Sequence, residues 1–337
     1  MVLKVVGKGD LSLLSNFQKN DFENYELYLS IYDEKIISDQ LRILPRTVKI
    51  SSIHTPSMVD VGGRRHPFDI AAVGNIGAAS LSSLKKTVEL AKRLGASVVV
   101  IHGASYNAFN DSKEESFERL AQRVLPLYDY DVKLCFENDV RWHNLYYHRR
   151  SLLASTEDFL KLDKFLGYKM KITADFEHLN LTFHFQEFVN HLGGEEAFMK
   201  RFSLIDQRPF EQAIQRFIKD NYQELQHKFK GHLFTFFETF REKIEHIHIN
   251  GSDCCNLSFN PHTTLPLIGE HLPLGFKDDT VEDRLDYDFI AKMLHSLPPQ
   301  KEINIVLEVW RTNPAEFLSA SLDSKAFLQK KLNQTKI

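Results

Sequence analysis

Short apolar segments alternate with amphipathic helical segments along the chain, and this alternation constrains the fold more than any other feature. The helical patterns include residues 80–95, 112–125, 155–167 and 285–297. Alternating strands and helices predict parallel strands joined by helical crossovers. Eight segments are short and apolar enough to be the strands: 3–7, 25–30, 48–54, 97–102, 132–137, 170–175, 245–250 and 303–308.

Eight strand–helix units favour closure into a (β/α)8 barrel, the TIM-barrel architecture of the α/β class. The alternative is an open, doubly wound sheet, but no GxGxxG sequence follows any of the eight segments. We therefore expect a single TIM-barrel domain over residues 1–337.

The segment between Asp175 and His248 is too long for one unit of such a barrel. It is helical in pattern and rich in aromatic residues. We expect a helical insertion between strands 6 and 7, at approximately 190–235, which either covers the site, forms an oligomer contact or thickens the outer ring of helices.

Composition places the chain in an ordinary globular class. Hydrophobic residues make up 43% and charged residues 26%. The net charge of −3 gives no sign of a surface for polyanions. Three cysteines form no disulfide framework, and no apolar run reaches the roughly 18 residues of a membrane helix. We expect a cytoplasmic protein with no membrane partner, and homo-oligomerisation is left open.

Six of the predicted strands end in a residue that can bind a metal or carry a proton. In a barrel, the carboxyl ends of the strands meet at one face, where active sites lie. Side-chain alternation places these residues on the inward face, as for Glu308 with Val306 and Asn304. The six residues are His54, His102, Glu137, Asp175, His248 and Glu308.

Three carboxylates and three imidazoles that converge in one barrel mouth would be unstable unless cations neutralised them. The same side chains are the usual ligands of Zn²⁺, Mn²⁺ or Co²⁺. The alternatives are an acid–base site without metal and a salt-bridged core. Because a catalytic metal keeps an open position, six ligands favour more than one ion.

Four motifs give the chain a resemblance to the xylose-isomerase-like barrel superfamily. They are FEN at 136–138, ADFEH at 174–178, HIHIN at 246–250 and VLEVW at 306–310. The segments EHLPLG at 270–275, SSIHTP and VVIHGA support the resemblance. The superfamily includes sugar and sugar-phosphate isomerases and epimerases, and the endonuclease IV type of abasic-site endonuclease.

The resemblance implies a divalent metal, Zn or Mn, and one to three ions. Glu137, Asp175, His248 and Glu308 would hold the ion that isomerases and endonucleases share. His54 and His102, with Glu137 as a bridge, would hold the second ion of the endonuclease-type site.

A third ion would use His178 and His271. Here the chain departs from the family pattern, because Gly269 stands where an aspartate is usual. Either Glu270 substitutes or this ion is absent or weakly bound. His178 could instead contact the substrate, and His271 could be a hydrogen-bonding loop residue.

Two mechanisms compete. In a sugar isomerase or epimerase, the metal polarises a carbonyl group and Glu137 and Glu308 move a proton through an enediolate. In a phosphodiesterase, a metal-bound hydroxide attacks phosphorus, and the partner would be nucleic acid. Ser57 stands where we would expect an aromatic wedge for DNA. The ligand set, with His54 and His102, favours the phosphodiesterase, whereas these surroundings favour the isomerase or epimerase. We favour a small sugar or sugar-phosphate substrate, and the third alternative is a barrel that has lost catalysis and only binds.

Two residues just after Glu137 extend the predicted substrate site. Arg141 and Trp142 could line the pocket, and the indole of Trp142 offers a face on which a sugar can stack. Packing is the commoner use of such residues.

Overall fold

Eight parallel strands close into a barrel in the computed structural model of the chain, which confirms the predicted (β/α)8 fold. The structure describes residues 2–17, 21–107, 111–140, 149–201, 208–256, 270–310 and 313–335. The barrel strands are β1 (Val2–Gly9), β2 (Tyr25–Leu27), β3 (Ile50–His54), β6 (Val98–Ile101), β8 (Lys133–Glu137), β10 (Lys171–Asp175), β11 (Ile244–Ile249) and β12 (Glu302–Leu307).

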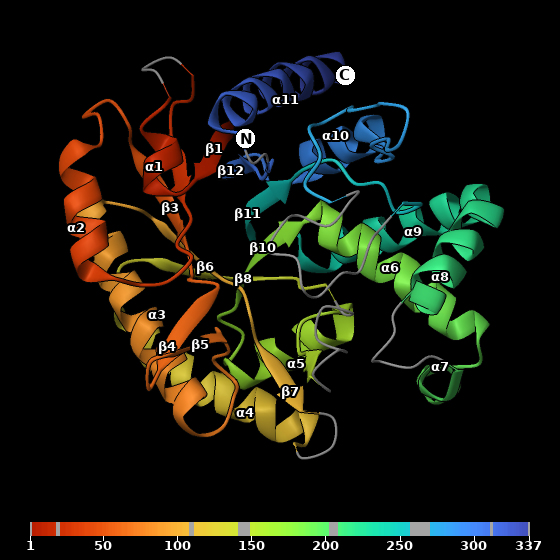
Figure 1. The fold of residues 1–337 in the computed structure, drawn as a ribbon, viewed down its shortest axis with the longest axis horizontal. Helices are drawn as coiled ribbons and strands as arrows, with labels where there is room; N and C mark the ends of the chain where they lie inside the picture. Colours follow the sequence, from red (N-terminus) through yellow and green to blue (C-terminus); the bar gives the residue numbers. More distant parts are fainter. Residues whose placement is uncertain are drawn as a thin grey trace.

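Helices follow the strands and form the outer ring of the molecule (Figure 1). Most begin at a Ser, Asp or Asn side chain that accepts a hydrogen bond from the first turn, as Ser155 and Asp286 do. The helices are α1 (Leu11–Leu14), α2 (Glu34–Ile43), α3 (Gly74–Leu94), α4 (Lys113–Val124), α5 (Thr156–Phe165), α6 (Phe176–His191), α7 (Glu195–Arg201), α8 (Arg208–Asp220), α9 (Tyr222–Phe240), α10 (Tyr287–Ser296) and α11 (Pro314–Gln334).

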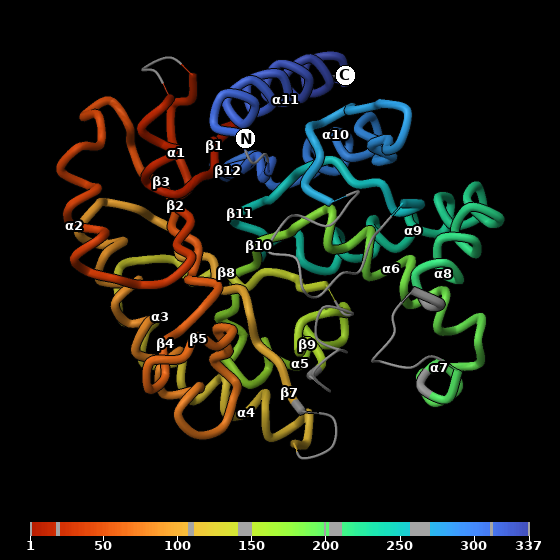
Figure 2. Tube along the Cα trace, viewed as in Figure 1, coloured from red at the N-terminus to blue at the C-terminus, as the bar shows by residue number. Residues whose placement is uncertain are grey.

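The barrel closes between the first and last strands, where Lys4 pairs with Asn304 and Val6 with Val306. Figure 2 shows the red start of the chain close to the blue α11 that ends it. Two short antiparallel pairs lie outside the barrel: β4 (Met58–Val61) with β5 (Arg64–Pro67), and β7 (Ser105–Asn107) with β9 (Arg149–Ser151). A 3-10 helix (Leu125–Asp129) follows α4.

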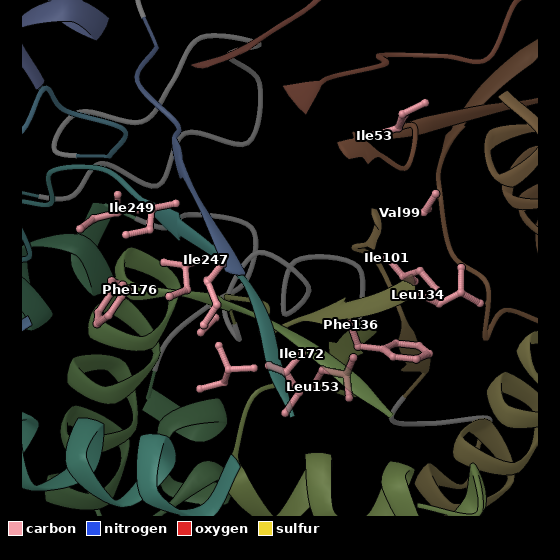
Figure 3. Close-up of a cluster of buried hydrophobic side chains, with 14 of the residues drawn as sticks. Ile53, Val99, Ile101, Leu134, Phe136, Leu153, Ile172, Phe176, Ile247 and Ile249 are labelled. Carbon is pink, nitrogen blue, oxygen red and sulfur yellow. The ribbon is translucent and has the colours of Figure 1, made fainter. Parts of the chain in front are cut away.

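Apart from the first residues of β1, β8 and β12, the barrel strands are largely buried on both faces. Their outward side chains join the large core between strands and helices, in which Figure 3 labels Phe136, Ile172, Ile247 and Ile249. Inward side chains form a separate apolar layer of Val98, Val100 and Cys135. Side chains along the barrel strands therefore alternate between the inside of the barrel and the helices, as the sequence predicts.

Four helices, α6 to α9, lie between β10 and β11, the sixth and seventh strands of the barrel. Phe236 and Phe240 of α9 belong to the main core, whereas Phe198 of α7 and Ile214 of α8 pack in a second core. In Figure 1, α7 and α8 lie at the edge of the molecule, beside α6. The insertion at 190–235 stays a prediction; α7 and α8 fall within these bounds and pack outside the main core.

Cys135, Cys254 and Cys255 are buried free thiols. Within the described residues, every helix is too short or too polar to cross a bilayer.

Candidate metal centre

Four acidic and imidazole side chains meet inside the barrel mouth. Glu137 and Asp175 are the last residues of β8 and β10, His248 lies near the end of β11, and Glu308 directly follows β12. All four are buried. They come from strands that are consecutive around the barrel, because β8, β10, β11 and β12 are neighbours. We refer to these four residues as the tetrad.

The imidazole of His248 is the centre of the tetrad. Its Nδ1 atom lies 2.8 Å from Oε1 of Glu137, 3.0 Å from Oε2 of Glu308 and 3.8 Å from Oδ2 of Asp175. One ligand atom from each of the four residues lies within 4.8 Å of the others. The sequence-predicted residues of the shared metal site are therefore brought together.

Local structure fixes the orientation of Asp175. Its Oδ1 atom accepts a hydrogen bond of 2.7 Å from the backbone N–H of His178, so the residue is the N-cap of α6. The side chain of Asn138 bonds both the N–H and the carbonyl group of Asp175, at 2.8 and 2.9 Å. The second carboxylate oxygen, Oδ2, is buried in the tetrad without a hydrogen-bond partner.

The carboxylates differ in how strongly they favour ionisation. Burial opposes the charged form of Glu137, but the charge of His248 holds the pKa well below its usual range. Burial acts in the same way on Glu308, and Lys8 and His248 together hold its pKa well below normal. Asp175 has its pKa raised to about 6, because burial outweighs the attraction of His178 and because Glu137 and Glu308 repel its charge.

A divalent cation fits this donor set. Three carboxylates surround Nδ1 of His248, and Oδ2 of Asp175 and Oε2 of Glu308 are buried without a hydrogen-bond partner. Buried polar atoms of this kind are normally satisfied, and a bound ion is one way to satisfy them. Carboxylate oxygens and one imidazole suit Mn²⁺, Zn²⁺ and related ions.

His54 and His102 lie beside the tetrad. The Nε2 atom of His54 is 3.2 Å from Oε2 of Glu137, and Nε2 of His102 is 3.2 Å from Oδ1 of Asp139. Their rings are 5.6 Å apart. Burial lowers the pKa of His54; burial also opposes the charge of His102, but Asp139 raises its pKa to about 9.

His178 and His271 also point into this region. Nδ1 of His178 donates to the backbone oxygen of Asn138 at 2.8 Å and lies 3.9 Å from Glu137. The backbone of His271 has a φ of 49°, in the left-handed region. Burial lowers the pKa of His271 to about 4.

Glu177 connects His271 to the strand ends. Its Oε1 atom accepts a hydrogen bond of 2.8 Å from the backbone N–H of His271, and its Oε2 atom bonds the side chain of Asn250. Nδ1 of His271 lies 3.2 Å from the same carboxylate. Glu270, proposed as a substitute ligand, is buried. Gly269 and the predicted substrate residues Arg141 and Trp142 lie outside the described residues.

Sequence reasoning places His246 one layer deeper than His248, in an orienting or packing role, but it missed Lys8 and Glu26 in the same polar layer below the tetrad. Glu26, His246 and His248 form the other group of side chains, among the described residues, that could hold a metal ion. The ammonium group of Lys8 lies 2.7 Å from Glu308 and 3.3 Å from Glu26. Lys8 is one residue beyond the predicted first strand, and Glu26 does not end its strand. Two signals could have identified them. Lys8 lies two residues after Val6 and so shares its face of the strand, and Glu26 pairs with the inward-facing Ser52 of the next strand.

Comparison with known proteins gives a fold and a family. A search of curated protein sequences finds no match. Among solved structures, a D-tagatose 3-epimerase-like protein shares 16% identity over 98% of both chains, with a TM-score of 0.56. A D-psicose 3-epimerase solved in the presence of D-fructose shares 11% over 98% of this chain and 99% of its own, with a TM-score of 0.54.

A third similar structure is a xylose isomerase-like TIM-barrel protein from Mycobacterium smegmatis in complex with magnesium. It shares 11% identity over 98% of this chain and 97% of its own, with a TM-score of 0.53. At these identities the likenesses show the fold alone. The family model described as xylose isomerase-like TIM barrel matches residues 32–330. The chain therefore belongs to the xylose isomerase-like TIM-barrel family.

Proposed function

We propose that the protein is a divalent-metal-dependent isomerase or epimerase that acts on a sugar or sugar phosphate. One observation carries the proposal: Glu137, Asp175, His248 and Glu308 present ligand atoms within 4.8 Å of one another at the mouth of the barrel. Such a group can hold one cation and leave coordination positions open for a substrate.

A divalent cation held by the tetrad would polarise the carbonyl group of a bound sugar and so acidify the adjacent C–H bond. The chain's own contribution is the placement of charge. Lys8 and His248 keep Glu308 ionised, and His248 does the same for Glu137. Both residues are thus available as carboxylates at neutral pH.

Glu137 and Glu308 are the proposed proton-transfer pair. They come from β8 and β12, with β10 and β11 between them, so they approach a substrate from different sides. In an isomerisation, one carboxylate takes a proton from the hydroxyl-bearing carbon next to the carbonyl group and returns it to the carbonyl carbon, while the hydroxyl proton passes to the former carbonyl oxygen. In an epimerisation, the opposing carboxylate first takes a proton from water and gives it to the other face of the first carbon, and the first carboxyl group then releases its proton to water.

Substrate hydroxyl groups would contact the histidines at the rim. Because Nδ1 of His178 donates to a backbone oxygen, its Nε2 atom is the acceptor. We propose that His178 accepts a hydrogen bond from the sugar. Three expectations stay predictions: the substrate-binding roles of Arg141 and Trp142, the cytoplasmic location and a homo-oligomer.

The names of similar structures support the proposal that the substrate is a sugar. Two of them are 3-epimerases or 3-epimerase-like proteins, and one of these was solved in the presence of D-fructose. The structure described as in complex with magnesium supports a divalent ion in a barrel of this shape.

One contact favours a second candidate function, an endonuclease IV-like phosphodiesterase. Nδ1 of His54 donates to the backbone oxygen of Thr55 at 2.7 Å, which leaves Nε2 as an acceptor. This atom faces Oε2 of Glu137 at 3.2 Å. Two acceptors at that distance need a proton or a cation between them, and a second ion is what the endonuclease-type site requires.

Proton exchange separates the two candidates. Purified protein with Mn²⁺ is incubated in deuterated water with a panel of ketoses and their phosphates, and deuterium at carbon is measured by NMR. The proposal predicts incorporation that depends on the metal and on Glu308. Cleavage of an abasic-site duplex, without exchange into any sugar, would favour the phosphodiesterase.

A further inference from the structure

Below the tetrad lies a layer of charged and polar side chains that neither candidate reaction uses directly. It consists of Lys8 on β1, Glu26 on β2, Ser52 on β3 and His246 on β11. Lys8 pairs with Glu26, and Glu26 with Ser52, in the register of the barrel. The side chains of Glu26 and His246 have no exposed surface, and Lys8 is 4% exposed.

Glu26 is surrounded by donors. Its Oε2 atom accepts hydrogen bonds from the hydroxyl of Ser52 at 2.9 Å and from Nε2 of His246 at 2.8 Å. Its Oε1 atom lies 3.0 Å from Nε2 of His248 and 3.3 Å from the ammonium group of Lys8. Within the described part of the chain, neither Nε2 of His248 nor Oε1 of Glu26 has a hydrogen-bond partner, so their 3.0 Å approach is an ion-pair contact.

This arrangement disfavours a metal ion between Glu26, His246 and His248, although their ligand atoms lie within 4.8 Å of one another. A carboxylate has about four lone-pair positions. Two donors already approach each oxygen of Glu26, and one of them is the cation of Lys8, which would repel a second cation. Glu26 is therefore placed to hold side chains rather than an ion.

We infer that Glu26 is a positioning residue for His248. A neutral imidazole has one N–H donor and one acceptor nitrogen, and the partner of the donor decides which is which. In this structure Nδ1 of His248 donates to Oε1 of Glu137 at 2.8 Å, and Nε2 faces Oε1 of Glu26 at 3.0 Å. A cation held by the tetrad would replace the hydrogen on Nδ1, while the hydrogen on Nε2 would stay opposite Glu26 and hold the ring in place. Carboxylates that orient a metal-binding histidine in this way are common in metal sites.

Lys8 connects this positioning contact to the tetrad. Its ammonium group lies 2.7 Å from Oε1 of Glu308 and 3.3 Å from Oε1 of Glu26. The ammonium group therefore neutralises one carboxylate in each layer and fixes the position of Glu26 relative to Glu308. The expected effect of Glu26 on metal binding rests on the proposed metal centre, whereas the contact between Glu26 and His248 can be tested without a metal.

The test compares Glu26→Gln, Glu26→Asp and a control, Glu245→Gln. Glutamine removes the charge opposite Nε2, so the hydrogen on Nε2 faces a neutral amide and the ring is held less firmly. Aspartate keeps the charge beside Lys8, which protects the fold, but shortens the reach to His248. Glu245 is a buried glutamate of β11 whose partners are Lys133, Lys171 and Lys301, away from the tetrad.

Zn²⁺ affinity is measured by calorimetry, and the hydrogens of His248 are followed by NMR of protein labelled with ¹⁵N-histidine. We expect Glu26→Gln and Glu26→Asp to weaken Zn²⁺ binding by about 10- to 100-fold, with the Nε2–H signal of His248 moved upfield in the glutamine variant. Glu245→Gln should bind as the wild type does. Wild-type affinity in both Glu26 variants, with an unchanged Nε2–H signal, would overturn the inference.

If the wild type binds no Zn²⁺, the proposed metal centre fails, and the positioning inference is then decided by the spectra of the metal-free proteins. An Nε2–H signal of His248 that is shifted downfield in the wild type and in Glu245→Gln, but moves upfield in Glu26→Gln, would support it. The same signal in all three proteins would refute it.

Discussion

Nδ1 of His248 lies 2.8 Å from Oε1 of Glu137, although the two residues belong to strands that are separated by β10. Both side chains point into the barrel, and both are buried. The contact shows that the tetrad is assembled from strands that are neighbours in the sheet, not from residues close together in the sequence. It also explains why the pKa of Glu137 stays well below its usual range despite burial.

Glu308→Gln should lower turnover by at least about 100-fold, because the amide cannot accept a proton from carbon. The fold should persist, since Lys8 keeps Glu26 as a partner. Steady-state kinetics and circular dichroism check both expectations. Glu302→Gln is the matched control, because Glu302 starts the same strand and is largely exposed beside Lys4. Retained turnover in Glu308→Gln would remove Glu308 from the mechanism.

Asp175→Asn and Asp175→Ala should separate capping from metal binding. Asparagine keeps the oxygen that caps α6, so its unfolding free energy should stay near that of the wild type. Alanine also loses the cap, at a cost of about 1 kcal/mol. Both variants should bind Mn²⁺ more weakly, as measured by calorimetry. Wild-type Mn²⁺ affinity in Asp175→Asn would show that this carboxylate is not a ligand.

His54→Ala tests the number of ions. The tetrad does not include His54, so the proposed isomerase or epimerase site should keep one bound ion per chain in this variant. Metal content after dialysis, measured by mass spectrometry, gives the ratio. A wild type with two ions and a variant with one would instead favour the endonuclease-like candidate.

His184 should make the protein less stable in acid. Burial lowers its pKa to about 4, so the folded state resists a proton that the unfolded chain accepts below pH 6.5. Its contribution is complete at neutral pH and is lost as the pH falls from about 6.5 to 4, by roughly 3 kcal/mol in total. Urea unfolding across this range measures the loss.

The matched variants for this prediction are His184→Gln and His191→Gln. His184 is buried in α6, where its Nδ1 donates to the backbone oxygen of Asn180 at 2.7 Å, whereas His191 lies exposed at the end of the same helix. The dependence of stability on acid should become shallower in His184→Gln only. An unchanged slope in that variant would contradict the assignment.

The fold and the tetrad could be predicted from sequence because both depend on local patterns. Each strand is short and apolar, and Glu137, Asp175 and Glu308 stand where a strand ends. Because the carboxyl ends of parallel strands share one face of a barrel, position within a strand was enough to gather these residues.

The layer below the tetrad could not be predicted in this way. Lys8 lies in a strand that extends to Gly9, two residues beyond the predicted end, and a lysine at a strand end is ordinarily solvated. Its burial depends on Glu26 of the neighbouring strand and on Glu308 of the last one. Contacts of this kind depend on the register of barrel closure, which no single segment of the sequence specifies.

Anomalous diffraction from crystals grown with Zn²⁺ tests the central claim most directly, because it locates the ion without reference to activity. We expect the strongest peak within about 2.0–2.2 Å of Nδ1 of His248 and of oxygens from Glu137, Asp175 and Glu308. A tetrad without a peak at saturating Zn²⁺, with ions only at surface sites, would contradict the proposed metal centre.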